Sequence, residues 1–106
     1  MTITMIQATV MKIDDPGIDQ IIAYWVDVEP GKGYVTLTCY GAAWTAYFGA
    51  MGGYTIQGFF ERVDVGYMVT KMAAPSLKQG KRHDAYLERI VTTVQKALLI
   101  CTQGAA

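Results

Sequence analysis

The chain has 106 residues, nine basic and nine acidic side chains, and an apolar share of 52%. This length suits a single domain, residues 1–106, with a core of its own. A formal net charge of zero supplies no electrostatic footprint for nucleic acid, so we expect no duplex DNA partner. Because no apolar run reaches the roughly 20 residues of a membrane span, we expect no membrane partner either.

Two strands are predicted at the start of the chain. Residues 3–13 are β-branched and sulfur-rich with loose alternation, which is typical of a strand. The sequence Asp-Asp-Pro-Gly at residues 14–17 is a strong turn signal. Residues 18–28 then alternate as a second strand, with Tyr24 and Trp25 on opposite faces.

A third strand is predicted to start at Tyr34, after a hairpin connection at residues 29–33. Its core face carries Val35, Leu37 and Cys39. A lone glycine in a strand indicates a bulge, and Gly41 interrupts this one. We therefore expect one long bent strand, or a strand followed by an edge segment, that ends at Gly49.

From Tyr54 the apolar period changes from two to 3.6, which predicts helices. Thr55 is a candidate N-cap for residues 56–63, and Asp64 is a candidate N-cap for residues 65–72. Glycines in both segments favour two short helices over one long helix.

A long last helix is predicted over residues 82–102, with 103–106 as a mobile tail. Its apolar stripe consists of Leu87, Ile90, Val91, Val94, Leu98 and Cys101. The predicted fold class is therefore α+β, a three-stranded antiparallel meander followed by two short helices and one long C-terminal helix packed on one face.

The titratable residues form no catalytic or metal-binding pattern. His83 is the single histidine, it has no histidine partner at helical spacing, and its structural role would be that of an exposed residue at a helix start. Cys39 and Cys101 are interpreted as reduced thiols, since no secretion signal precedes them. We expect no catalytic residue, no metal and no cofactor, although carboxylates that meet only in the fold leave a small enzyme as an alternative.

One basic cluster is a candidate anion site. Four groups within six residues could hold a phosphate or an acidic partner, helped by a helix N-terminus; they are Lys78, Lys81, Arg82 and His83. A solvated loop that keeps the chain soluble explains the same residues more simply.

The aromatic residues of the strands give the main candidate interface. Its members are Trp25, Tyr40, Trp44 and Tyr47. Tryptophan and tyrosine are enriched at the centres of protein interfaces, and they also stack on bases. We expect Trp44 to be at least partly exposed, because its neighbours Thr45 and Ala46 are too small to cover it.

The run from residue 34 to 52, then Phe59-Phe60 and residues 64–67, resembles a group of small accessory proteins of tailed bacteriophages and prophages of enteric bacteria. The likeness covers roughly residues 29–95 and carries over no catalytic residue. It implies a small protein made in the cytoplasm of the infected bacterial host. Such accessory proteins commonly bind a host or defence component.

Two functional hypotheses follow. The first is a non-enzymatic phage accessory protein that binds and modulates a host or defence protein through an aromatic strand surface. The alternative is a small-ligand (nucleotide) or single-stranded nucleic-acid binding protein that uses tryptophan stacking and the basic loop. The low charge and large apolar share also predict a homo-oligomer, with a dimer favoured.

Overall fold

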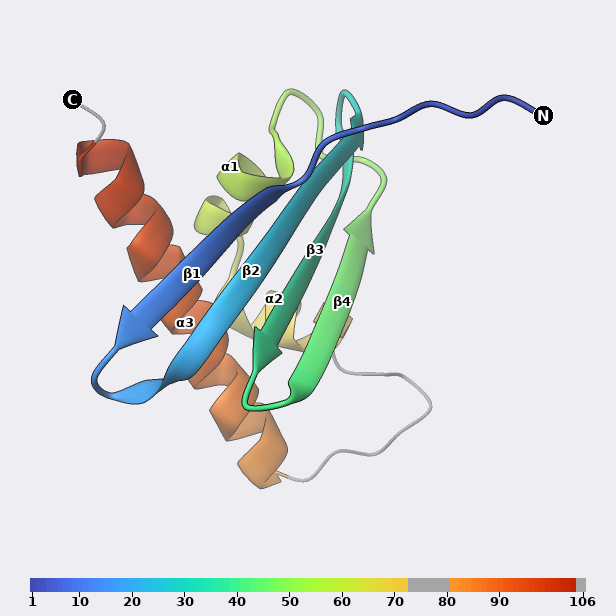
Figure 1. The fold of residues 1–106 in the computed structure, drawn as a ribbon. Coiled ribbons are helices and arrows are strands. Elements are labelled where there is room, and N and C mark those ends of the chain that lie inside the picture. Colours follow the sequence, from blue (N-terminus) through green and yellow to red (C-terminus); the bar gives the residue numbers. More distant parts are fainter. Residues whose placement is uncertain (73–80, 105–106) are drawn as a thin grey trace.

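The computed structural model of the chain describes residues 1–72 and 81–104. Its elements, in chain order, are β1 (Thr9–Asp15), β2 (Ile18–Glu29), β3 (Lys32–Cys39), β4 (Ala42–Phe48), α1 (Ile56–Arg62), α2 (Val65–Met72) and α3 (Lys81–Gly104). The strands form one antiparallel sheet in the order β1-β2-β3-β4, and the helices lie on one side of it (Figure 1). The predicted α+β meander with a long C-terminal helix is confirmed, but the sheet has four strands instead of three.

The fourth strand arises because Gly41 belongs to a tight turn and not to a bulge. Cys39 pairs directly with Ala42, so Tyr40 and Gly41 form a two-residue hairpin loop. Both loop residues have positive φ, 51° at Tyr40 and 80° at Gly41, as a type I′ turn requires. Asn-Gly or Asp-Gly is the usual sequence at these two positions. With tyrosine at the first position, the sequence does not indicate this turn.

The first strand begins six residues later than predicted, at Thr9. Its ladder with β2 starts at the pair Thr9 and Trp25. Residues 1–8 are all exposed and leave the sheet as an extended arm (Figure 1). The β-branched composition of these residues favours a strand, but they pair with no other strand of the described structure. The predicted start at residue 3 is therefore wrong.

The core lies between the inner face of the sheet and the three helices. The strands contribute Ile21, Ala23, Trp25, Val35, Leu37, Cys39, Trp44, Ala46 and Phe48. The helices contribute Ile56, Phe60, Met68, Met72, Leu87, Ile90, Val91, Val94 and Leu98. At the centre, the rings of Trp25 and Phe60 meet edge to face with centroids 5.2 Å apart.

Side-chain caps fix the two short helices, as predicted. The Thr55 hydroxyl accepts a hydrogen bond from the Gly58 amide over 3.2 Å, and Asp64 Oδ2 accepts one from the Tyr67 amide over 3.0 Å. A carboxylate of β2 also holds α1 in place, because Asp27 Oδ1 accepts a hydrogen bond from the Ile56 amide over 2.8 Å.

The long helix α3 continues to Gly104, two residues beyond its predicted end. Five members of its predicted stripe are buried, but Cys101 is exposed, because the C-terminal end of α3 extends past the β1 edge of the sheet (Figure 1). The predicted loop at residues 76–80 and the tail residues 105–106 lie outside the described residues. Within 1–72 and 81–104, no helix combines the length and the hydropathy that a membrane crossing requires.

Candidate functional site

The side of the sheet opposite the helices forms a candidate interaction surface, which we call the outer face. Strand alternation sends every second side chain to this side, and the register aligns those side chains in rows across the strands. Its uncharged members are Val10, Ile22, Tyr24, Val26, Val28, Tyr34, Thr36, Thr38, Ala43, Thr45 and Tyr47.

Three tyrosines stand on the outer face. Tyr34 and Tyr47 are direct partners on β3 and β4, and their ring centroids lie 4.7 Å apart. Tyr24 on β2 opposes Thr36, whose hydroxyl lies 2.9 Å from that of Thr45. All three tyrosines are partly exposed, so their rings offer apolar area and their hydroxyls offer hydrogen bonds.

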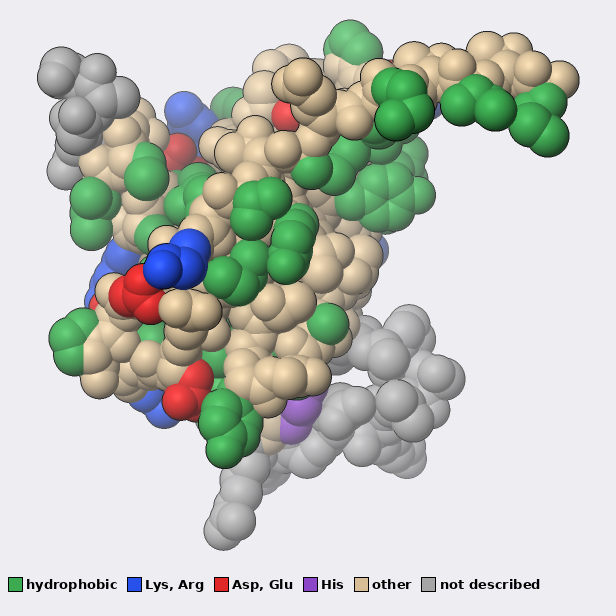
Figure 2. Space-filling model, viewed as in Figure 1, with side chains coloured by type: hydrophobic (Ala, Val, Ile, Leu, Met, Phe, Trp, Pro, Cys, Tyr) green, Lys and Arg blue, Asp and Glu red, His purple; other side chains and the backbone are tan. Residues whose placement is uncertain are grey.

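Charge is confined to the margins of the outer face. Lys12 lies on the edge strand β1, and its Nζ is 3.8 Å from Asp14 Oδ2 on the same strand. Figure 2, which looks onto this face, shows hydrophobic side chains over the sheet and charged atoms mainly toward the β1 side and the periphery. A charge-poor, tyrosine-rich sheet face matches the composition of protein interface centres.

Tyr40, predicted as an interface residue, stands at the tip of the β3–β4 turn and is 85% exposed. Its φ of 51° is the left-handed conformation, which costs a residue with a Cβ roughly 1–2 kcal/mol. The side chain recovers none of this cost through burial. Strain of this kind at an exposed aromatic residue is a common property of functional positions.

We expect Tyr40→Asn to stabilise the fold by about 1 kcal/mol, since asparagine adopts the left-handed conformation more readily. Guanidinium melts measure the change. Tyr40→Phe is the control and should leave the midpoint unchanged, because it keeps the backbone preference and removes only the hydroxyl. A lower midpoint for Tyr40→Asn would contradict a strained turn.

The two tryptophans predicted for the interface are buried, so that part of the prediction is wrong. Trp25 is 2% exposed and Trp44 is 8% exposed. The turn at Tyr40-Gly41 resets the strand alternation and places Trp44 opposite Leu37 on the core face. Each indole nitrogen has a partner, since Trp25 Nε1 donates to Met11 Sδ at 3.2 Å and Trp44 Nε1 donates to His83 Nε2 at 3.0 Å.

The predicted anion-binding cluster is not assembled by the described residues. Lys78 lies outside them, and Lys81 and Arg82 open α3 with side chains that are not described. His83 is half-buried against Trp44 and not an exposed helix-start residue as expected. Because its Nε2 accepts the indole hydrogen bond, Nδ1 carries the proton of the neutral ring, and it lies 3.5 Å from Asp84 Oδ1.

Next to this pair, a small polar cluster joins α3 to the sheet. Cys39 Sγ lies 3.1 Å from the Tyr86 hydroxyl, which donates to Asp19 Oδ2 over 3.3 Å. The hydrogen bond with Cys39, followed by burial and the charge of Asp19, raises the pKa of Tyr86 well above its ordinary value, so the phenol stays protonated.

The geometry of this cluster favours a structural role. The hydrogen bonds of Cys39 go to Tyr86 and to the Asp19 carbonyl, whereas His83 bonds Trp44, so the thiol and the imidazole are not joined as a nucleophile and base. Across residues 1–72 and 81–104, no group of three or more potential metal ligands converges.

Comparison with known proteins gives one informative result. Residues 1–84 match the model of a family described as a phage family. Neither a curated protein nor a solved structure gives a significant match.

Proposed function

The chain belongs to a phage family, and from that membership we propose that it is a non-enzymatic accessory protein that binds and modulates a host or defence protein through its outer face. The observation that carries the proposal is the uncovered, charge-poor sheet face that carries Tyr24, Tyr34 and Tyr47. A phage protein of this kind acts in the cytoplasm of the infected bacterium.

The chemistry of the outer face defines the partner that fits it. Apolar side chains alternate with tyrosine and threonine hydroxyls, and the face carries almost no charge. A complementary surface is therefore another apolar protein patch with a few hydrogen-bonding groups, not a polyanion. Tyr40 at the adjacent hairpin tip adds a projecting aromatic side chain.

Nucleic-acid or nucleotide binding receives less support. That alternative depended on stacking by Trp25 or Trp44, and both rings lie in the core. It also depended on the basic cluster, of which His83 is engaged with Trp44. Lys12 on the outer face is paired with Asp14, so it supplies little attraction for phosphates.

We expect a triple variant, Tyr24→Thr with Tyr34→Thr and Tyr47→Thr, to lose the partner while staying folded. Threonine keeps the strand propensity, so the sheet is preserved. Tagged wild-type and variant proteins are captured from infected cells, the enriched partner is identified by mass spectrometry, and its affinity is measured by calorimetry. Loss of the three rings should weaken binding at least about 30-fold, the equivalent of a 2 kcal/mol hot spot.

Tyr54→Thr is the matched control, because Tyr54 has similar exposure but lies in the loop before α1. It should retain the partner. Binding should also change little with added salt, whereas phosphate-led binding weakens steeply. A partner retained by the triple variant, or no protein enriched by the wild type, would contradict the proposal.

A further inference from the structure

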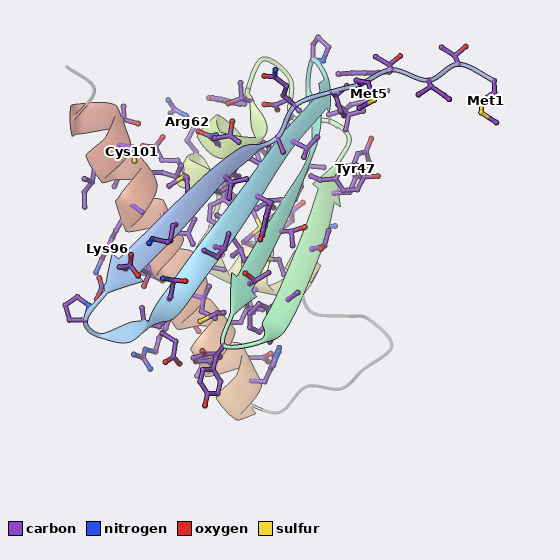
Figure 3. All side chains as sticks on the ribbon, viewed as in Figure 1. Met1, Met5, Tyr47, Arg62, Lys96 and Cys101 are labelled. Carbon is purple, nitrogen blue, oxygen red and sulfur yellow. The ribbon has the colours of Figure 1, made fainter. Side chains whose placement is uncertain are left out.

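The N-terminal arm, residues 1–8, is an extended apolar segment without cover. It contains no charged residue, and Met1, Ile3, Met5 and Ile6 are all exposed. Figure 3 shows Met1 and Met5 on the arm, away from the helical layer. At roughly 3.3 Å per residue, an extended arm of this length reaches about 26 Å beyond the sheet. Exposed apolar segments of this kind are typically covered by a protein surface.

Apolar side chains occupy odd-numbered positions at the start of the arm and again in β1, with the polar Gln7 and Thr9 between the two groups. Met1, Ile3 and Met5 have the same parity as Met11 and Ile13, whose side chains pack toward the core. If the arm lies in the plane of a sheet as a strand, its odd-numbered side chains therefore belong on the helix side.

A site that can accept the arm lies beside β1, which is an edge strand. Within the described residues, β1 pairs with β2 along one backbone edge, and its other edge is open to a further strand. Below the open edge lies a groove of about 430 Å³ between β1, α1 and the end of α3. Its lining includes Thr9, Met11, Gly58, Leu98, Cys101 and Thr102.

No described residue covers the end of α3 at this edge. Leu99 and Ile100 are exposed where the helix extends past the sheet (Figure 1). A fifth strand next to β1 would extend the sheet over this part of the helix.

We propose that the arm of one copy pairs antiparallel with β1 of a second copy and places Ile3 and Met5 in that copy's groove. The two copies are related by a two-fold axis perpendicular to the sheet. Residues that oppose each other across this axis lie on the same face of the sheet, so odd-numbered residues of one copy oppose odd-numbered residues of the other. The odd side chains of the arm then meet the side of β1 that carries Met11.

A second copy is favoured as the occupant because the same segment supplies both the arm and the receiving edge. One two-fold axis therefore forms two equal contacts, as in an isologous dimer. The net charge of zero removes general repulsion between copies. The arm contact leaves the outer face free, so this inference does not depend on the proposed function.

Sedimentation at about 100 μM tests the association, since ordinary weak dimers have micromolar dissociation constants. The wild-type chain should sediment as a dimer, and the double variant Ile3→Asp with Met5→Asp should dissociate with a constant at least about tenfold higher. Ile6→Asp is the control of opposite parity and should remain dimeric. A monomeric wild type, or a double variant whose dissociation constant over a dilution series equals that of the wild type, would overturn the proposal.

Disulfide trapping tests the geometry. Met5→Cys places a thiol on the arm, and native Cys101 is an exposed, free thiol on the groove. Added diamide, which takes up two electrons and two protons, should link position 5 of one chain to Cys101 of the other, and Cys101→Ser should abolish that link. Ile6→Cys should link at least about tenfold less, since thiols that point apart are not bridged. An intrachain link at monomer mass would show that the arm fills its own groove and would overturn the proposal.

Discussion

Phe60→Ala should lower the free energy of unfolding by about 3–5 kcal/mol, the largest loss that we expect from a single substitution in a helix of this chain. Phe60 is 0% exposed, and its ring meets the Trp25 indole edge to face. Truncation removes that contact and leaves a cavity between α1 and the sheet, where the backbone of α1 is held by Asp27 and cannot collapse freely. Because domains of this size are stable by about 5–15 kcal/mol, much of the protein's stability would be lost.

Guanidinium melts of Phe60→Ala and Phe60→Leu measure this effect. Leucine refills most of the volume, so Phe60→Leu should cost clearly less than the alanine variant. Phe59, which is only partly buried, is the neighbouring control, and Phe59→Ala should cost less than Phe60→Ala. A loss below about 1 kcal/mol for Phe60→Ala would mean that this side of α1 does not face the core.

The helical half of the fold was predictable because its signals are local. Thr55 and Asp64 cap the helices that their side chains predict, and the break between α1 and α2 falls at Asp64 as expected. The apolar stripe of α3 is buried from Leu87 to Leu98 because a 3.6-residue period fixes one face. The exposure of α3 at Cys101 depends on where the sheet ends, and no local sequence pattern specifies that position.

The number of strands and the orientation of the tryptophans depend on a single turn. Strand alternation identifies a face only as long as the strand is continuous. A glycine after Cys39-Tyr40 indicates either a bulge or a hairpin, and only the hairpin gives Trp44 the parity of Leu37. The backbone φ of Tyr40 settles the question, and it is set by tertiary pairing of β3 with β4.

Part of the candidate surface could have been found from the sequence. Strand alternation puts Tyr34 on the face opposite Val35, Leu37 and Cys39, and it puts Tyr24 on the face opposite Trp25; both tyrosines are exposed in the structure. The enrichment of tryptophan at protein interfaces favours Trp25 and Trp44, but both are buried in the core. The two tyrosines of the prediction, Tyr40 and Tyr47, are exposed in the structure.

Trp44→Ala should also destabilise the fold by about 3–5 kcal/mol, the penalty of a buried aromatic residue. Trp44 is the largest core side chain of β4, an edge strand, and its indole also donates a hydrogen bond to His83 on α3. Its ring lies 6.4 Å from that of Tyr86, so truncation loosens the contact between β4 and the start of α3.

Trp44→Phe separates packing from hydrogen bonding. Phenylalanine keeps most of the ring volume but leaves His83 Nε2 without its donor, so we expect a loss of about 1–2 kcal/mol. His83→Ala in the Trp44→Phe background should then cost less than His83→Ala in the wild type, because the shared hydrogen bond is already gone. Denaturant melts of the four proteins complete the cycle. If Trp44→Ala leaves the midpoint almost unchanged, the indole is not part of the core. The assignment of the core face and the outer face of β4 would then be wrong.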